Sequence, residues 1–235
     1  MSLLNRTILM AGGTGGLGSA TAELLLSEGA RLVMSYRSNS SRAEVWKQRA
    51  MVLQADLKSA NDRERLLDAT GELYGLVVFA GDPVRTGSPP ETLTHGFEVN
   101  CAGPLLLARE AAERMKEKGT AGAIVLFGTM QAVALFPGST AYAAGKAALV
   151  HGAQILAKEC RGPANVRVNT ICPGVMQAGM ASASIASGKY DRYIADGTIS
   201  RFGRAEDIAR TVRFLLEPDN YVTGQVLTID GGLTL

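Results

Sequence analysis

Histidine and cysteine are both scarce in this chain of 235 residues. The two histidines, His95 and His151, lie far apart, and Cys101, Cys160 and Cys172 include no CxxC pair. A structural or catalytic metal site needs several such ligands at characteristic spacing, so the sequence does not indicate one. An odd cysteine count without an apolar signal-peptide core predicts plain buried thiols in a reducing, cytoplasmic setting.

Long apolar runs and long basic runs are also missing. No stretch approaches the ~20 apolar residues of a membrane helix, which excludes a membrane-spanning protein as the expected class. Lys and Arg number 24 against 22 Asp and Glu, and their even distribution argues against nucleic acid as a partner. The motifs GxSxG and GxxxxGK[ST] are absent, so hydrolase and nucleotide kinase interpretations lack their core residues.

Short apolar segments alternate with helical patterns along the chain. The segments are rich in β-branched residues and apolar on both faces, as in strands buried within a parallel sheet; they cover 7–11, 31–35, 51–55, 75–80, 123–128, 166–171 and 225–229. Helical patterns fit between them at 16–28, 59–71, 91–118, 139–161 and 205–217. This alternation predicts an α/β fold: one domain over residues 1–235, a Rossmann-type doubly wound parallel sheet of about seven strands with helices on both faces.

Residues 175–200 are the least patterned part of the chain, rich in Ala, Ser, Gly and Met. They follow a strand end, which is where doubly wound folds bind ligands. The segment is therefore expected to be a substrate lid. A surface loop containing a short helix is the alternative.

A glycine-rich turn follows the first expected strand and begins the first expected helix. Backbone N–H groups and the helix dipole make that position suitable for a pyrophosphate. Two templates fit: GxGxxG uses Gly13, Gly15 and Gly18, whereas GxxxGxG uses Gly12, Gly16 and Gly18. A purely structural glycine turn is the alternative.

The end of the second expected strand bears on cofactor choice. A fold that selects NAD usually carries an acidic residue there for the ribose 2′-hydroxyl. None occurs between Arg31 and Glu44, where Ser35, Arg37, Ser38 and Arg42 are found instead. An arginine flanked by hydroxyls suits a 2′-phosphate, so NADP(H) is favoured over NAD(H), with Arg37 as the main contact. A solvated basic turn remains the alternative.

Tyr142 precedes Lys146 by four residues, with small residues between them. On a helix this spacing places both on one face, about 6 Å apart along the axis. A nearby ammonium favours the phenolate and is expected to lower the tyrosine pKa from its ordinary value near ~10. Taken alone, YxxxK is a common chance match.

In combination these motifs resemble the short-chain dehydrogenase/reductase family, along nearly the whole chain. The resemblance includes NCAGP at 100–104, VRVNTICPG at 166–174, RFGRAEDIA at 201–209 and YVTGQVLTIDGG at 221–232. Chain length and glycine spacing resemble the compact branch, and the C-terminal part is similar to 3-oxoacyl-[acyl-carrier-protein] reductases. Enoyl reductases in the wider family usually space tyrosine and lysine more widely, so the resemblance implies carbonyl/alcohol chemistry.

The resemblance implies a role for each residue. Tyr142 would exchange the proton, Lys146 would bind the nicotinamide ribose, and Asn100 would hold a water in a proton relay. Asp56 would contact the adenine. The implied cofactor-binding residues are Gly12, Thr14, Gly15, Gly16, Leu17, Gly18, Tyr36, Arg37, Ser38, Asp56, Leu57, Ala80, Gly81, Tyr142, Lys146, Pro173, Gly174 and Val175. A small carbonyl or alcohol would be the substrate, and a homotetramer or homodimer would be the assembly, with small residues around Ala147, Ala148 and Gly152 at an interface.

The chain departs from the family pattern in several places. Thr129 stands where the catalytic serine is usual; it keeps the hydroxyl, whereas Ser139 and Thr140 are expected to cap the next helix. NNAG is replaced by VFAG at 78–81, and the threonine usual after PG is Ala178. These changes leave a second hypothesis open: a dinucleotide-binding sensor or scaffold with little turnover.

Pro104 bears on the role of Asn100. A proline has no N–H to donate to the carbonyl four residues earlier, and its ring pushes that carbonyl aside. Pro104 is therefore expected to free the Asn100 carbonyl for a water. A kink with no catalytic role is the alternative.

Overall fold

Residues 2–85 and 87–235 are described by the computed structural model. Over these residues the chain forms one seven-stranded sheet in the order β3-β2-β1-β4-β5-β6-β7, with every neighbouring pair parallel. The strands are β1 Thr7–Ala11, β2 Arg31–Tyr36, β3 Met51–Gln54, β4 Leu73–Val78, β5 Ala123–Phe127, β6 Arg167–Pro173 and β7 Val226–Ile229. This confirms the expected fold class, and each strand bound lies within two residues of the expectation.

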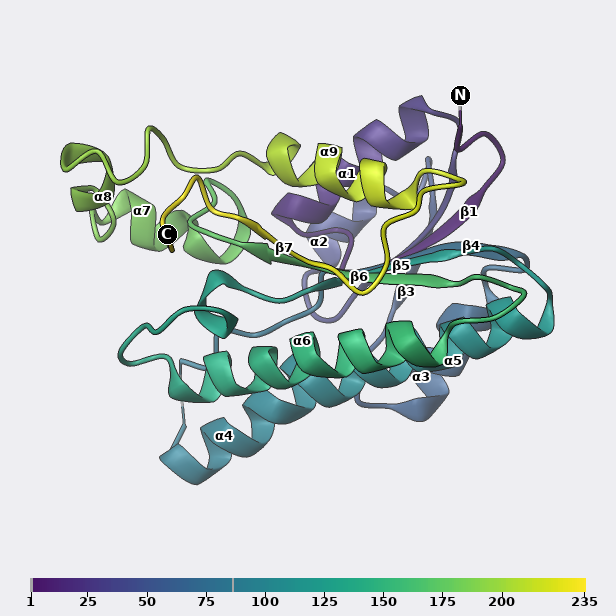
Figure 1. The fold of residues 1–235 in the computed structure, drawn as a ribbon, viewed down its shortest axis with the longest axis horizontal. Helices are drawn as coiled ribbons and strands as arrows, with labels where there is room; N and C mark the ends of the chain where they lie inside the picture. Colours follow the sequence, from purple (N-terminus) through teal and green to yellow (C-terminus); the bar gives the residue numbers. More distant parts are fainter. Residues whose placement is uncertain (1, 86) are drawn as a thin grey trace.

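Helices cover both faces of this sheet (Figure 1). On one face lie α1 (Gly16–Ser27) and α9 (Ala205–Leu216), and on the other lie α3 (Ala60–Asp68), α5 (Gly103–Glu117) and α6 (Thr140–Glu159). Successive strand residues point to opposite faces, so Ile8 and Met10 join one apolar layer while Leu9 and Ala11 join the other. The sheet is thus buried between two apolar layers, as the continuous hydrophobic strands predict.

The expected helix over 91–118 is interrupted. The structure has α4 (Pro89–Phe97), a π-helical turn (Glu98–Ala102) and then α5. The N–H of Gly103 donates to the carbonyl of Glu98, five residues earlier, and Pro104 has no N–H to give Asn100. The helix widens where the sequence places Asn100 and Pro104, and such turns often mark functional sites.

The segment 175–200 contains short helices: a 3₁₀ turn at Gly179–Ala181, α7 (Ser182–Ala186) and α8 (Arg192–Ala195). Ile185 and Tyr193 pack on a separate apolar cluster that includes Met130, Ile199 and Phe202. The helices α7 and α8 lie beyond the carboxyl end of the sheet (Figure 1). The segment is therefore ordered against the body of the protein at the edge where ligands are expected to bind.

The glycine turn contains glycines with different structural demands. Gly12 has φ of +73°, and a Cβ on Gly18 would overlap the carbonyl oxygen of Gly13, so both positions need glycine for the fold itself. A Cβ on Gly15 would lie 3.4 Å from the carbonyl oxygen of Gly12, its nearest neighbour. The protein's own packing therefore leaves Gly15 room for a side chain, and its backbone is open toward the adjoining cavity.

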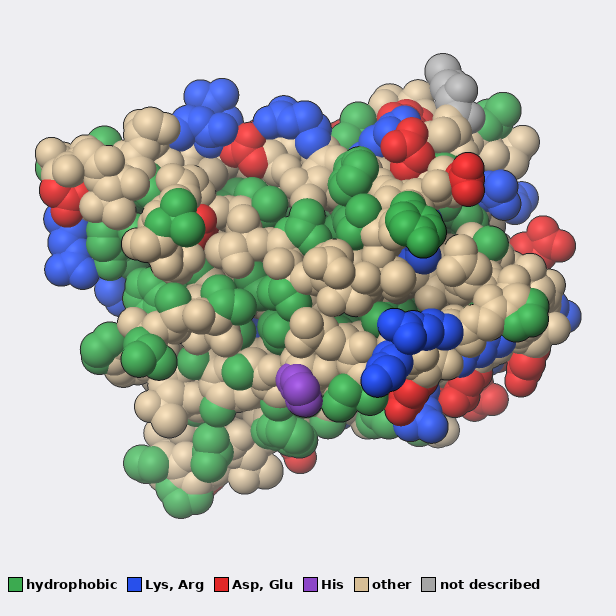
Figure 2. All heavy atoms as spheres, in the orientation of Figure 1, with side chains coloured by type: hydrophobic (Ala, Val, Ile, Leu, Met, Phe, Trp, Pro, Cys, Tyr) green, Lys and Arg blue, Asp and Glu red, His purple; other side chains and the backbone are tan. Residues whose placement is uncertain are grey.

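On the face shown in Figure 2, Lys and Arg side chains form separated groups with acidic side chains among them. None of the helices in the described parts of the chain has the length and apolar character needed to span a bilayer. Across the same residues, His, Cys, Asp and Glu form no group of three that could hold a metal ion.

Candidate active site

Two cavities lie side by side at the carboxyl edge of the sheet. The first, which we call the β2 cavity, has a volume of about 450 Å³ and reaches from the glycine turn to the end of β2. The second, which we call the Tyr142 cavity, has a volume of about 510 Å³. Leu17, Phe79 and Met180 line both, so the two cavities are adjacent.

Most of the expected cofactor residues line the β2 cavity. They are Gly12, Thr14, Gly15, Gly16, Leu17, Gly18, Tyr36, Arg37, Ser38, Asp56, Leu57, Ala80 and Gly81. The Tyr142 cavity takes Thr129, Tyr142, Lys146, Pro173, Gly174 and Val175. Asn100 lines neither cavity and is fully buried.

The glycine turn is tied to β2 by a hydrogen bond in which the N–H of Gly12 donates to Oγ of Ser35 at 3.1 Å. Beyond Ser35, Asn39 accepts at Oδ1 from the N–H of Arg42 at 3.0 Å and thereby caps α2 (Ser40–Glu44). The short helix α2 and the cavity residues Asn39, Lys58 and Met180 were not expected from the sequence. Only the Asx cap of Asn39 could have indicated α2.

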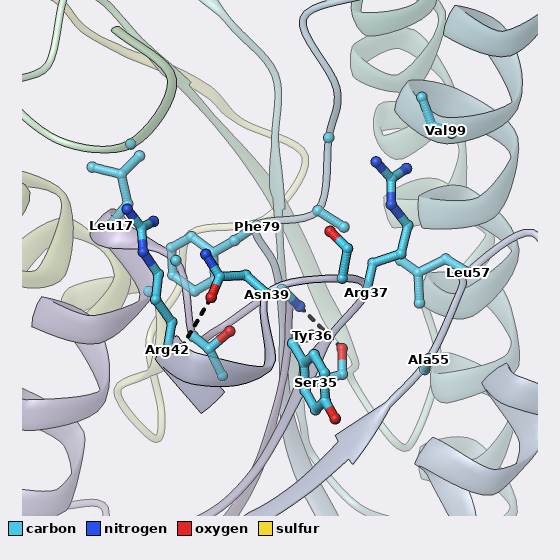
Figure 3. Close-up of a pocket in the computed structure, with 18 of the residues that line it drawn as sticks. Leu17, Ser35, Tyr36, Arg37, Asn39, Arg42, Ala55, Leu57, Phe79 and Val99 are labelled. Carbon is cyan, nitrogen blue, oxygen red and sulfur yellow. Dashed lines mark hydrogen bonds between the residues drawn. The ribbon is translucent and has the colours of Figure 1, made fainter. Parts of the chain in front are cut away.

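Arg37 lies in the β2 cavity as expected, but its guanidinium is paired. Its Nη2 is 3.1 Å from Oδ2 of Asp82. Figure 3 shows the Arg37 guanidinium on the Val99 side of the cavity, whereas Arg42 lies on the Leu17 side. The cation expected to meet a 2′-phosphate is therefore engaged by a carboxylate from the loop after β4, a partner that the sequence did not reveal.

Asp82 is held by several groups at once. Burial raises the pKa of its carboxyl, but hydrogen bonds from the Val84 N–H and from Arg37 outweigh this, so the pKa lies below its ordinary value. Nε2 of His95 lies 3.6 Å from the same Oδ2 that meets Arg37. The carboxylate is consequently ionised at neutral pH.

Thr129 and Tyr142 come together in the Tyr142 cavity. Thr129 is buried just beyond the end of β5, and its Oγ1 accepts from the N–H of Gln131 at 3.4 Å. Ser139 also lines the cavity and occupies the N-cap position of α6, but its hydroxyl donates to the carbonyl of Phe136 at 2.7 Å and makes no capping bond. The expectation that its side chain caps the helix is wrong.

Lys146 is 2% exposed and carries its ammonium into the protein. Its Nζ donates to the carbonyl of Phe127 at 2.7 Å and reaches the carbonyl of Ala80 at 3.5 Å. Burial lowers the pKa of this group from 10.5 to about 8. The lysine is thus a buried cation that can lose its proton close to neutral pH.

Tyr142 departs from the expected pKa direction. Burial raises the pKa of the phenol to about 12, and the Thr129 hydroxyl opposes part of this rise. The ammonium of Lys146 is hydrogen-bonded to the carbonyls of Phe127 and Ala80. The Tyr–Lys spacing alone therefore does not produce the lowered tyrosine pKa that the sequence analysis expected.

Asn100 lies in the π-helical turn, and its side-chain amide is hydrogen-bonded to the backbone of Asp82. Its Oδ1 accepts from the Asp82 N–H at 2.9 Å, and its Nδ2 donates to the Asp82 carbonyl at 2.9 Å. A Cβ placed on Gly81 would lie 3.1 Å from Oδ1 of Asn100 and 3.2 Å from Nζ of Lys146. Asn100 and Lys146 therefore approach the same glycine from two different helical segments.

Comparison with known proteins agrees with this geometry. The family model described as Enoyl-(Acyl carrier protein) reductase matches residues 11–234. The chain is 30% identical to the NADPH-dependent aldehyde reductase-like protein, chloroplastic, of Arabidopsis thaliana over 99% of this chain and 95% of that protein. It is 31% identical to Carbonyl reductase family member 4 of Danio rerio over 99% of both chains.

Among solved structures, a short-chain type dehydrogenase/reductase from Mycobacterium ulcerans superposes with a TM-score of 0.90 at 27% identity, covering all of this chain and 91% of that one. A Rossmann-type sheet with a glycine turn, an adjoining Tyr–Lys pair and these relatives defines an oxidoreductase of the dinucleotide-binding class. The chain belongs to the short-chain dehydrogenase/reductase family.

The lowered pKa of Lys146 predicts a pH-dependent stability. Between pH 8 and 9 the folded lysine releases its proton while the unfolded lysine keeps it, so the unfolded state binds more protons and stability rises with pH. From the value of about 8, this contribution is about 1 kcal/mol over that interval. Urea unfolding of the wild type and Lys146→Met at both pH values measures it as a difference, because other titrations, such as that of Cys172, are shared. An equal pH response in both proteins would contradict the assignment.

Proposed function

We propose that this protein is an NADP(H)-dependent oxidoreductase that interconverts a carbonyl and a secondary alcohol on a small molecule. The observation that carries the proposal is the convergence of Thr129, Tyr142 and Lys146 on one cavity that adjoins the β2 cavity. The names of the two curated relatives, an NADPH-dependent aldehyde reductase-like protein and a carbonyl reductase, support the same chemistry.

The residues fit a dinucleotide on structural grounds. Gly15 has no close contact that would explain the absence of a side chain, and the start of α1 offers N–H groups suited to phosphate. Arg37, Arg42 and Lys58 line the β2 cavity; Arg37 is paired with Asp82 and Lys58 with Glu98. Three cationic side chains beside the end of β2 favour a cofactor that carries an additional phosphate. When bound, NADP(H) supplies or accepts the hydride.

The proton steps belong to the protein. The Thr129 hydroxyl orients the substrate oxygen, and the Tyr142 phenol, protonated at neutral pH because of its raised pKa, is ready to donate to that oxygen. Lys146, whose pKa of about 8 lies near neutrality, is suited to pass protons between the site and a water held at Asn100. A 3-oxoacyl thioester is one substrate within this class, consistent with the likeness to 3-oxoacyl-[acyl-carrier-protein] reductases.

The segment 175–200 serves as the lid of the Tyr142 cavity, which it lines with Met180 and Tyr190.

Tyr142→Phe tests the proton donor. Removing the phenol hydroxyl should lower kcat for NADPH-dependent carbonyl reduction by about 10²- to 10⁴-fold while NADPH affinity stays within about 2-fold of the wild type. Fluorescence titration and a carbonyl substrate panel measure the two quantities. The exposed Tyr221→Phe is the matched control and should retain full activity. Normal turnover by Tyr142→Phe would refute this role.

NADPH binding without turnover of any substrate by the wild type would favour a sensor or scaffold.

A matched pair of substitutions tests Thr129. Thr129→Ser keeps the hydroxyl and should retain activity within a few-fold, whereas Thr129→Val keeps the shape but loses the hydrogen bond and should lower kcat/KM by about 100-fold. Ser139→Ala, in the same cavity, separates the two hydroxyl candidates. If Ser139→Ala lost activity and Thr129→Val did not, the assignment would move to Ser139.

We also propose that the protein is a homodimer or homotetramer. Four apolar side chains on the helical layer of α4, α5 and α6 are at least 44% exposed: Leu93, Phe97, Leu106 and Ile155. Figure 2 shows apolar side chains gathered over α4. At Gly152, which lies on the small-residue face expected at an interface, a Cβ would meet Leu105 of the same chain at 2.8 Å, so this glycine also allows the close approach of α5 to α6.

Light scattering tests this assembly. The wild type should elute as a dimer or tetramer, and Phe97→Asp should shift it toward smaller species because a charge at an apolar interface is costly. Val45→Asp, which changes an exposed apolar residue at the end of α2, is the control and should not change the mass. A stable wild-type monomer would rule out the proposed assembly.

A further inference from the structure

Asp82 is a carboxylate with almost no freedom to move. Asn100 holds its backbone N–H and carbonyl, each at 2.9 Å. The Val84 N–H donates to Oδ1 of its side chain at 2.9 Å. The position of the second oxygen, Oδ2, is thereby set by the backbone of its own loop and by the π-helical turn.

That second oxygen meets Arg37, which lines the β2 cavity. The Nη2–Oδ2 distance is 3.1 Å, and the side chains of Arg37 and Asp82 are 48% and 25% exposed. His95 approaches the same oxygen at 3.6 Å. The guanidinium is drawn to this side of the cavity and away from Arg42 (Figure 3).

A 2′-phosphate that binds Arg37 therefore competes with the Asp82 carboxylate, whose position is fixed. If the guanidinium leaves Asp82, the carboxylate loses its partner in a partly buried position. If it stays, phosphate and carboxylate share one cation and repel each other. In both cases a ribose that carries a 2′-phosphate binds less favourably. A ribose with a free 2′-hydroxyl carries no such charge and does not meet this penalty.

We propose that Asp82 is a specificity-determining residue, whose carboxylate competes with the cofactor 2′-phosphate for Arg37 and limits the preference for NADPH over NADH. This inference rests on the proposed function, since it assumes that Arg37 meets the 2′-phosphate. Its sequence position, in the loop after β4, lies 45 residues from Arg37. Cofactor choice is therefore set by two loops of the sheet edge together.

Asp82→Asn tests the competition with little change in shape. The amide oxygen can keep the bond from the Val84 N–H, while the amide nitrogen cannot accept from Arg37. Fluorescence titration should show NADPH affinity rising by about 3- to 5-fold, the scale of a partly exposed ion pair. NADH affinity should not change.

The comparison with Arg37→Ala completes a double-mutant cycle. In the Arg37→Ala background, Asp82→Asn should produce no gain, because no cation is left to release. Glu64→Gln, which removes one negative charge from an exposed position on α3 outside both cavities, should leave both affinities unchanged.

Three outcomes would overturn the inference alone while NADPH binding remains dependent on Arg37. The first is an unchanged NADPH affinity in Asp82→Asn. The second is a lowered NADPH affinity, which would mean that Asp82 positions Arg37 for the phosphate. The third is a gain in NADPH affinity from Asp82→Asn that persists in the Arg37→Ala background. If neither the wild type nor Asp82→Asn prefers NADPH and Arg37→Ala changes nothing, the NADP(H) part of the proposed function fails with it.

Discussion

Burial of the sheet on both faces is the constraint on which the rest of this structure depends. Because α1 and α9 cover one face and α3, α5 and α6 the other, polar chemistry is confined to the edge where the strands end. The glycine turn follows β1, Arg37 follows β2, Asp82 follows β4 and Thr129 follows β5. The two cavities at that edge therefore collect side chains from distant parts of the chain without interrupting either apolar layer.

The same burial gives Lys146 the largest desolvation penalty in the site. Lys146 is an almost fully enclosed cation, and removing an ammonium from water is unfavourable unless other groups replace the lost hydration. The carbonyls of Phe127 and Ala80, at the ends of β5 and β4, provide that replacement in part. The remaining penalty appears as a pKa lowered to about 8, which is also the property that suits a group to proton transfer near neutral pH.

Sequence reasoning recovered the features that depend on local pattern. Continuous apolar segments define buried strands wherever they occur, so the strand bounds and the fold could be anticipated. The expected site residues other than Asn100 also line the two cavities, although many further lining residues were not expected. The π-helical turn was missed as a structure, although Pro104 indicated that the helix was disturbed there. The side chain of Ser139 was wrongly expected to cap α6. Capping propensity describes the residue type alone, whereas in the structure the hydroxyl donates to the carbonyl of Phe136.

Contacts between strand ends were beyond that reasoning. An arginine without an acidic neighbour in sequence indicates a free cation, yet Arg37 is paired with Asp82 from another strand end. Likewise, the YxxxK spacing indicates proximity but not hydrogen-bond direction, and the lysine ammonium is bonded to backbone carbonyls. Both errors concern the partner of a charged group, which depends on the arrangement of loops rather than on the period of a helix or strand.

These contacts also join the two halves of the site. Arg37 meets Asp82, Asn100 holds the backbone of Asp82, and Asn100 and Lys146 approach Gly81 together. A displacement of the loop after β4 would therefore alter the surroundings of the buried ammonium as well as the position of the carboxylate that faces Arg37. Replacing the family's NNAG by VFAG leaves this arrangement intact, because the loop is held through the backbone of Asp82 and through Asn100. Val78 and Phe79 have separate roles, since Val78 is buried in the core and the Phe79 ring packs against Phe127 with centroids 4.5 Å apart.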